Sequence, residues 1–423
     1  MTNPRFAPDA RITADGRSLP AALRASVARI SLQLGLEGAD RLELTVASDG
    51  LRWLEHPQLA LGCELRLELG YAPDPLEQVF VGDVVGLMPS FPSTGTPTLT
   101  VVAHDRRARL QQGSRTRQFA VAIPYAGNYP MPDTAVAGIV AAENALLLAS
   151  DPVSLAIAAA LGGVEYGISA ATGTGAHELI RKQEKEDDLQ FLTRLAEENG
   201  WLMTVDHAGA LGGNVLRFTS FFAHVLPDVT FRYGENLIEF SPRLTTVGEI
   251  LRVTTRFWIP QLKVEMTVTA GWDWDRQALD VSAVPSFGLP GGSATSSSES
   301  KVPTMLLGEE VSAKTASRVM LAKLIGKLNE RLTGTASIIG DTRLRPGGVV
   351  QIDGVGAMFG GLYRVTEVTH SLGTDGFRTT FGVRKEVWFD GAHLMQGLKV
   401  MAKGLIPKGA ESVLPGGVKE AFQ

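Results

Sequence analysis

The feature that most constrains the fold of this chain is a β unit that occurs twice within 423 residues. The C-terminal copy spans residues 344–385, where runs such as Val350 to Asp353 alternate apolar with polar side chains between glycine-rich turns. Alternation with a period of two, bounded by turn residues, indicates antiparallel strands. A second copy with the same order of features lies within residues 59–105.

The two copies share a glycine, an alternating strand, a Phe-x-Gly triplet and a hairpin, in that order. Any two β-hairpins share some of these features, so generic similarity is the alternative explanation. The repeated order of all four features favours an internal duplication. The aligned positions are Gly62 with Gly347, Leu65 with Val350, Leu67 with Ile352, Phe80 with Phe359, and Gly82 with Gly361.

Periodicity and composition divide the chain into four parts. We expect residues 1–115 to form a first tube-like β-barrel, because alternating runs follow one another there without helices. Residues 116–235 mix both patterns and predict an inserted α+β domain. Residues 236–390 predict a second tube-like β-barrel, followed by a C-terminal tail at residues 391–423. The predicted fold class is β-rich α+β and multidomain, with two similar antiparallel β-barrel domains and an inserted α/β domain.

Two segments stand out within the second predicted barrel. Residues 283–304 are rich in Ser, Gly and Pro, and predict a mobile loop because they can bury little apolar surface. Residues 312–332 predict a long amphipathic helix, whose apolar stripe includes Ala316, Met320 and Leu324.

The inserted segment begins with two expected helices. Asp133 or Thr134 is expected to cap a helix that runs to Leu147, and Asp151-Pro152 is expected to open a second. A strand is then expected from Glu178 to Lys182.

A third expected helix carries stronger end signals. Asp187 with Gln190 forms a capping-box pattern, and Gly200 marks the helix end. A hairpin of two strands, Trp201 to Asp206 and Val215 to Thr219, follows.

Composition excludes several functional classes. The chain is 44% hydrophobic and 20% charged, as expected of a globular protein, and its net charge of −5 argues against a dedicated nucleic-acid binder. The single cysteine, Cys63, excludes an intrachain disulfide and a cysteine-based metal site, and we expect it to be a small buried hydrophobe. The N-terminus lacks a secretory apolar core, and no run of about 18 apolar residues predicts a membrane span.

No candidate catalytic, cofactor-binding or metal-binding set emerges from the motifs. His177-Glu178 begins like a zinc-hydrolase helix, but Arg181 stands where the second histidine is needed. Asp273 and Asp275 could bind a cation, although a hairpin turn is the favoured interpretation. The chain is therefore predicted to be no enzyme, with no catalytic residues, no metal and no cofactor.

The glycines of the C-terminal unit resemble a phosphate-binding loop only in composition. Gly354, Gly356 and Gly360 follow one expected strand and precede another, so no helix N-terminus is expected there to meet a phosphate.

The helix after the acidic run resembles a segment of hub proteins in contractile injection machines. These are the late control gene D family of phage tails and the N-terminal half of the valine-glycine repeat spike proteins of type VI secretion. The β units resemble the barrels of that family in matching order, from about Arg11 to Trp388. The residues that carry the resemblance are Asp187, Asp188, Leu189, Phe191, Leu192, Arg194, Leu195, Glu197, Glu198, Gly200 and Trp201, with Phe80, Gly82, Phe359 and Gly361 in the β units.

The resemblance implies a structural hub built as a homotrimer. Three chains with two barrels each would form a pseudo-hexameric ring that joins a hexameric inner tube to a trimeric spike and nucleates assembly of the baseplate and tube. The implied partners are a separate spike protein, an inner tube or tube-initiator protein, baseplate wedge proteins, and DNA or effector cargo in the lumen. The implied location is the bacterial cytoplasm during assembly, then a phage tail or an extracellular injection particle.

Two other functional classes remain as alternatives. A hub-associated peptidoglycan hydrolase would need paired carboxylates in a cleft, and the sequence offers no such pair. A stand-alone carbohydrate-binding β protein would need exposed aromatic platforms, and aromatic residues make up only 7% of the chain.

Overall fold

The structure is a computed structural model, and the description below covers the parts of the chain that it places. The expected tail at 391–423, His177 with Glu178, and Asp275 lie outside these residues. The described residues are 7–123, 127–152, 154–155, 159, 179–209, 211–220, 223–245, 252–259, 264–273, 278–286, 304–306 and 316–386.

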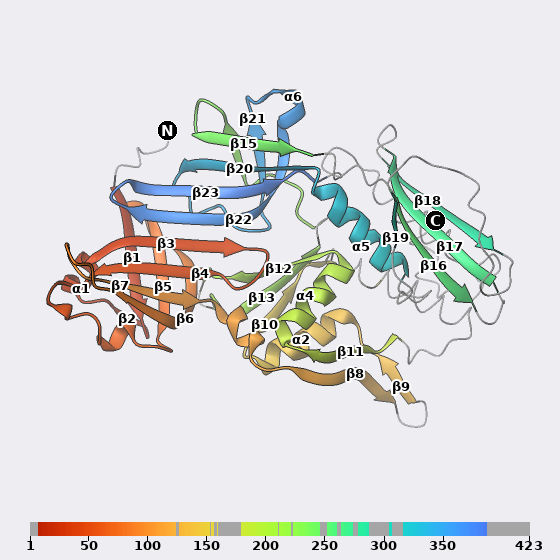
Figure 1. Cartoon of the computed structure of the whole chain (residues 1–423), viewed down its shortest axis with the longest axis horizontal. Coiled ribbons are helices and arrows are strands. Elements are labelled where there is room, and N and C mark those ends of the chain that lie inside the picture. Colours follow the sequence, from red (N-terminus) through yellow and green to blue (C-terminus); the bar gives the residue numbers. More distant parts are fainter. Residues whose placement is uncertain are drawn as a thin grey trace.

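Most of the strands form one sheet that runs through both β units (Figure 1). Its order is β15-β20-β23-β22-β3-β4-β7-β6-β5-β1-β2, with β21 paired to β22 and to β14. The first unit contributes β1 (Ala7–Ala14), β2 (Arg17–Ser18), β3 (Val27–Gly35), β4 (Arg41–Ala47), β5 (Glu64–Ala72), β6 (Glu77–Ser90) and β7 (Thr98–His104). The second unit contributes β14 (Val229–Arg232), β15 (Glu239–Leu244), β20 (Leu332–Ile339), β21 (Val349–Asp353), β22 (Gly361–Gly373) and β23 (Gly376–Arg384).

The β-rich, multidomain fold class is confirmed, and the structure adds how the two units are connected. They share one hydrogen-bonded sheet, because β3 pairs antiparallel with β22. One hydrophobic core lies under both units and includes Leu32 and Leu67 from the first, and Val350 and Phe381 from the second. The period-two pattern predicted these strands because the dry face of each one packs on that core.

The two units repeat the same backbone hydrogen bonds. The N–H of Gly62 donates to the carbonyl of Val84, and the N–H of Gly347 donates to the carbonyl of Val365. The bulge that follows Val84 in β6 recurs after Val365 in β22. These repeated bonds support the interpretation of an internal duplication.

The same hydrogen bonds correct the expected alignment of the Phe-x-Gly triplets. With Val84 equivalent to Val365, Gly82 corresponds to Tyr363, and Phe80 corresponds to Gly361. The predicted pairing of Phe80 with Phe359 and of Gly82 with Gly361 is therefore wrong by two residues. A two-residue shift keeps every side chain on the same face, so alternation alone cannot detect it.

The inserted segment has its own core and two small sheets. One sheet has the order β11-β8-β9 and the other β10-β13-β12, and the helices α2 and α4 pack beside them. The bounds are β8 (Arg115–Ile123), β9 (Gly127–Pro130), α2 (Asp133–Glu143), β10 (Leu147–Ser150), β11 (Arg181–Glu186), α4 (Asp188–Asn199), β12 (Trp201–Asp206) and β13 (Val215–Ser220).

Two element boundaries in this segment differ from expectation. The first helix ends at Glu143, and Leu147 instead begins β10, because Leu147 pairs in parallel with Val215. The expected strand from Glu178 to Lys182 is shifted toward the C-terminus and becomes β11, which pairs with β8. Local pattern does not fix such boundaries, because the pairing partner lies far away in sequence.

A separate four-stranded sheet lies within the stretch expected to form only the second barrel. It has the order β18-β17-β16-β19 and occupies the right side of Figure 1. Its strands are β16 (Arg252–Ile259), β17 (Val264–Asp273), β18 (Ala278–Ser286) and β19 (Thr304–Leu306).

This sheet also corrects the expected loop and helix. Strand β18 runs to Ser286 and β19 begins at Thr304, so the expected loop at 283–304 starts too early; residues 287–303 lie outside the described part. The long helix, α5 (Ala316–Asn329), ends before Leu332, which begins β20. The predicted domain divisions near residues 115 and 235 stay predictions.

Within the described ranges, no helix combines the length and apolarity that a membrane crossing requires. The remaining short elements are α1 (Ala21–Ala25), α6 (Gly356–Phe359) and three 3-10 turns at Asp49–Leu51, Pro57–Leu59 and Arg106–Gln111. The single helical turn α6 was not expected between Gly354 and the next strand. Its four residues are too few to form a helix terminus that binds phosphate.

Candidate functional site

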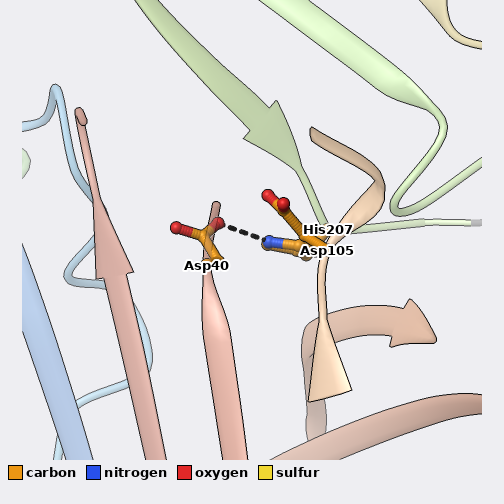
Figure 2. Close-up of side chains that lie close together, drawn as sticks. All are labelled: Asp40, Asp105 and His207. Atoms are coloured by element: carbon orange, nitrogen blue, oxygen red, sulfur yellow. Dashed lines mark hydrogen bonds and ion pairs between the residues drawn. The ribbon is translucent and has the colours of Figure 1, made fainter. Parts of the chain in front are cut away.

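A buried cluster of charged residues lies where the first β unit meets the inserted segment. Asp40 precedes β4, Asp105 follows β7, and His207 follows β12, so three separate turns deliver the side chains (Figure 2). His207 Nε2 lies 2.8 Å from an Asp40 oxygen. The guanidinium of Arg107 lies 2.5 Å from Asp40 and 2.8 Å from Asp105. All four side chains are buried.

Hydrogen bonds define the protonation of the histidine in this cluster. The backbone N–H of Val81 donates to His207 Nδ1 at 3.2 Å, so Nδ1 carries no proton and Nε2–H donates to Asp40. The ring of Phe80 packs on the imidazole at a centroid distance of 5.4 Å. Through these contacts His207 connects β6 and Asp40 to the inserted segment.

The two carboxylates of the cluster have opposite pKa shifts. Burial raises the pKa of Asp105 to about 6, and the neighbouring charge of Asp40 adds to that rise against the opposing charge of Arg107. Burial would raise the pKa of Asp40 too, but the charge of Arg107 and the hydrogen bond from His207 outweigh it and lower that pKa. Asp40 is therefore the more persistent anion of the pair.

Asp40, Asp105 and His207 bring potential metal-ligand atoms within 4.8 Å of one another. However, Arg107 already places its positive charge against both carboxylates, and its Nη1 also donates to the carbonyl of Gly35 at 3.2 Å. An ion would have to displace this buried guanidinium. The cluster is therefore a structural joint in which an arginine takes the place that a cation would need.

No sequence motif singles out these four residues. Asp40 and His207 are 167 positions apart, so no local motif could pair them. The one available signal was Asp105 directly after a strand, where it caps the turn Arg106–Gln111 by accepting from the N–H of Arg107.

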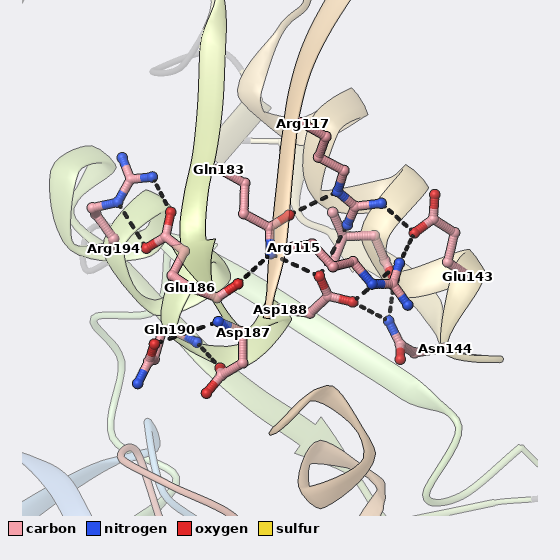
Figure 3. A network of polar contacts seen from close by, with 11 residues as sticks. Arg115, Arg117, Glu143, Asn144, Gln183, Glu186, Asp187, Asp188, Gln190 and Arg194 are labelled. Atoms are coloured by element: carbon pink, nitrogen blue, oxygen red, sulfur yellow. Dashed lines mark hydrogen bonds and ion pairs between the residues drawn. The ribbon is translucent and has the colours of Figure 1, made fainter. Parts of the chain in front are cut away.

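The acidic residue of the hub-like helix motif lies in a second buried network (Figure 3). Asp188 begins α4 and accepts hydrogen bonds from Arg117 at 3.0 Å, Asn144 at 2.9 Å and Gln183 at 2.9 Å. Arg117 extends the network to Glu143 at the end of α2. The network therefore ties α4 to β8, β11 and α2.

Helix α4 begins and ends as the sequence predicts. Asp187 and Gln190 form a complete capping box, and Gly200 ends the helix with a left-handed φ of 64°. Trp201, the first residue of β12, is buried against Phe218 at a centroid distance of 5.6 Å.

The apolar motif residues of α4 are buried in the core of the inserted segment, whereas Arg194 forms ion pairs at its surface. Phe191 stacks on Phe119 at a centroid distance of 5.3 Å. Arg194 pairs with Glu186 and Glu198 and lies over the ring of Phe191, half in solvent. The fully or nearly fully buried residues are Leu189, Phe191, Leu192 and Leu195.

The four motif residues of the β units form two separate pairs, Phe80 with Gly82 on β6 and Phe359 with Gly361 between α6 and β22. Phe80 is buried against His207, and Gly82 lies so close to the carbonyl of His104 that a Cβ would be 2.2 Å from it. Phe359 ends α6, and its carbonyl accepts from the hydroxyl of Tyr363 at 2.6 Å. Gly361 begins β22 with a φ of 114°, which favours glycine. The two pairs make packing and backbone contacts in different parts of the sheet and are not joined with α4 in one site.

A cavity of about 560 Å³ lies beside the buried cluster, between both β units and the inserted segment. Its charged lining residues already have partners: Arg217 and Arg345 pair with Asp206, and His224 pairs with Asp228. The four lining carboxylates are each held by a hydrogen bond, Asp40 by His207, Asp151 by Ser154, Asp206 by Arg217 and Asp228 by His224.

Comparisons with known proteins place this fold among tail proteins. The 43 kDa tail protein of prophage MuSo2 from Shewanella oneidensis superposes with a TM-score of 0.59 at 15% identity, covering 89% of this chain and 98% of that one. The tail protein from Neisseria meningitidis MC58 gives 0.57 at 13% identity, covering 92% and 100%. The E. coli c3393 protein, described as a component of the type VI secretion system, gives 0.53 at 13% identity, covering 90% and 78%.

These likenesses show that the chain has the fold of these tail proteins, and they support the hub-like fold that the sequence predicted. No curated protein matches the chain. The model of the Alg8 N-terminal domain matches residues 153–374. This match crosses the inserted segment, the sheet of β16 to β19 and part of the second β unit, and corresponds to no single unit of the fold.

Proposed function

We propose that the chain is the structural hub of a contractile tail or injection machine. The observation that carries this proposal is the β3–β22 pair, which fixes two similar β units side by side in one chain. Three such chains would present six similar units. A homotrimer of this kind can meet a hexameric inner tube with its six units and a trimeric spike with its three chains.

The fold supports this role, and the finer assignments are part of the proposal. We place the chain with the late control gene D family and with the hub half of the valine-glycine repeat spike proteins. Its partners are a separate spike protein, an inner tube or tube-initiator protein, and baseplate wedge proteins, with DNA or effector cargo in the lumen. It assembles in the bacterial cytoplasm and ends in a phage tail or an extracellular particle.

The buried carboxylates do not favour the hydrolase alternative. Asp40 and Asp105 are enclosed and held by Arg107, whereas a glycosidase needs its two carboxylates open to a sugar chain. The proposed role is therefore non-enzymatic.

Native mass measurement and particle imaging test the hub proposal. The chain, alone or with its spike protein, should have the mass of a trimer, and particles made without it should lack assembled tube. A chain that stays monomeric at high concentration and with its spike, or normal particles in its absence, would refute the hub role.

The tail at residues 391–423 is proposed to contact the spike or a baseplate subunit. A chain that ends at residue 390 should still form trimers but should retain less spike protein on affinity capture. Equal capture by the full and shortened chains would remove this assignment.

A further inference from the structure

Two strand edges of the large sheet lack a partner within the described part of the chain. Strand β15 pairs only with β20, and β6 beyond Val84 pairs only with β7. Figure 1 shows β15 at the upper border of the sheet, with β20, β23, β22, β3 and β4 following below it. Unpaired edges expose backbone donors and acceptors that another strand can use.

The internal repeat shows what such edges pair with. Strand β6 is equivalent to β22, because Val84 and Val365 make the same hydrogen bonds and precede the same bulge. Strand β15 is equivalent to β3, because Arg243 pairs with Thr333 of β20 as Gln33 pairs with Arg41 of β4. The pair β3–β22 inside the chain is therefore a template for a pair between β15 and β6.

The template fixes a register for the two free edges. Inside the chain, Leu34 lies opposite Val368, and Leu32 lies opposite His370. The equivalent pairs are Leu244 with Leu87, Arg243 with Met88, Pro242 with Pro89, Ser241 with Ser90, and Phe240 with Phe91.

One chain cannot make this pair with itself, because β15 and β6 are separated in the sheet by β20, β23, β22, β3, β4 and β7. Two copies can make it head to tail, and repetition of such a heterologous contact generates a ring when the rotation closes.

Apolar side chains on both edges fit this pairing. Phe91 is 59% exposed and Leu244 is 44% exposed, although their equivalents Leu372 and Leu34 pack at the joint inside the chain. Leu87 and Phe240 are already partly buried against the core. Pairing would continue that core from one copy to the next.

Prolines make the free edges different from the template. At the joint inside the chain, the N–H of Leu36 donates to the carbonyl of Thr366 across the β3–β22 pair. Every second residue of a strand directs its N–H and C=O to the same neighbour, so the backbone groups of Leu32 face β22 and those of His370 face β3. The equivalent positions are Pro242 and Pro89, which have no N–H to donate. The pair Pro89–Pro242 therefore cannot make the two backbone hydrogen bonds available to its equivalent, His370–Leu32.

We propose that β6 beyond Val84 and β15 form the contact between copies of this chain, in the register of β3–β22, with a gap in hydrogen bonding at Pro89 and Pro242. This inference rests on the proposed trimer. The ring then alternates continuous joints inside chains with proline-interrupted joints between them. The prolines also keep the free edges of a single copy from pairing with unrelated strands.

Cysteine cross-linking tests the register. In a Cys63→Ser background, Met88→Cys with Arg243→Cys places two thiols on a non-hydrogen-bonded pair, where Cα atoms about 4.5 Å apart suit a disulfide. Mild oxidation should give covalent dimers and trimers. Gln33→Cys with Thr369→Cys, the template pair, should instead form a disulfide within one chain.

The control is Met88→Cys with Glu239→Cys, which lies four residues out of register on β15 and should give no cross-link. If the in-register pair fails to cross-link in a protein with trimer mass, the contact is wrong while the trimer stands. If the protein is monomeric with its spike and no pair cross-links between copies, the proposed trimer fails as well.

Restoring the two donors tests the role of the prolines. Pro89→Val with Pro242→Val should lower the concentration at which the trimer dissociates by about tenfold, because two backbone hydrogen bonds become available at each joint. The parent and the variant are compared by mass at matched dilutions. An unchanged or weakened trimer would overturn the claim that these prolines interrupt the contact.

Discussion

Leu32 of β3 and His370 of β22 lie opposite each other across the strand pair that joins the two β units, and both side chains are buried. His370 Nδ1 lies 2.8 Å from the hydroxyl of Thr379 on β23. The joint inside the chain is thus a closed part of the core, with a histidine at its centre.

Acid should weaken this joint. Burial lowers the pKa of His370 to about 4, with the charge of Asp341 opposing the shift and that of Arg345 favouring it. The neutral ring therefore stabilises the fold fully above about pH 6.5, the usual histidine pKa, and the contribution is lost as pH falls toward 4. The loss due to His370 is about 3 kcal/mol, read as the difference between the parent and a His370 variant in urea unfolding at a series of pH values, because Asp105, with its pKa raised to about 6, acts in the opposite sense over the same range.

His370→Gln removes the titrating ring and keeps a polar side chain near Thr379. Between pH 6.5 and 4, its unfolding free energy should lose about 3 kcal/mol less than that of the parent. Ser371→Ala, next to His370 on β22 and without a titrating group, should keep the parental slope. If His370→Gln also keeps that slope, the buried ring is not its cause.

Removing the cation of the buried cluster should destabilise the protein. Arg107→Met leaves Asp40 and Asp105 buried without their partner, which costs about 3–5 kcal/mol in the unfolding free energy. Arg107→Met combined with Asp40→Asn and Asp105→Asn should recover part of this loss. Arg109→Met, which breaks a partly exposed pair with Asp83, should cost about 1 kcal/mol or less.

The same cluster should be insensitive to metal. Because Arg107 occupies the space between the carboxylates, neither zinc nor a chelator should shift the melting temperature of the parent protein. A melting temperature that rises with added zinc and falls on chelation would show that a metal, and not Arg107 alone, holds this joint.

Gly82 is expected to tolerate no side chain. A Cβ there would lie 2.2 Å from the carbonyl oxygen of His104 and 2.6 Å from the ring of Phe80. Gly82→Ala should therefore cost about 3 kcal/mol or more, read from the urea midpoint. Gly86→Ala on the same strand meets no atom closer than 3.7 Å and serves as the matched control. Equal midpoints for both variants would contradict the close approach.

Asp188 is expected to contribute to stability through its buried hydrogen bonds. Asp188→Asn keeps the shape but cannot accept from Arg117, Asn144 and Gln183 together, which should cost about 2–3 kcal/mol. Glu197→Gln, on the exposed face of α4, should change the melting temperature little. A similar small effect of Asp188→Asn would mean that the network adds little to stability.

Local rules predicted the parts of the fold that depend on neighbouring residues. The capping box of Asp187 with Gln190 and the end of α4 at Gly200 were predicted because each involves contacts within four residues. The strand Trp201–Asp206 was predicted with its correct bounds, because Gly200 ends α4 directly before it and a glycine-containing turn follows it. Leu147 was misassigned to a helix, because its strand partner Val215 is distant in sequence.

The sequence by itself determined the β-rich class, the repeated unit and the ends of α4, because periodicity and capping are local properties. Only the tertiary structure decided which strands pair across long distances. It placed β3 against β22, separated β16 to β19 into their own sheet, and enclosed Arg107 between Asp40 and Asp105. Such pairings depend on the packing of whole elements around a shared core, which no single stretch of sequence encodes.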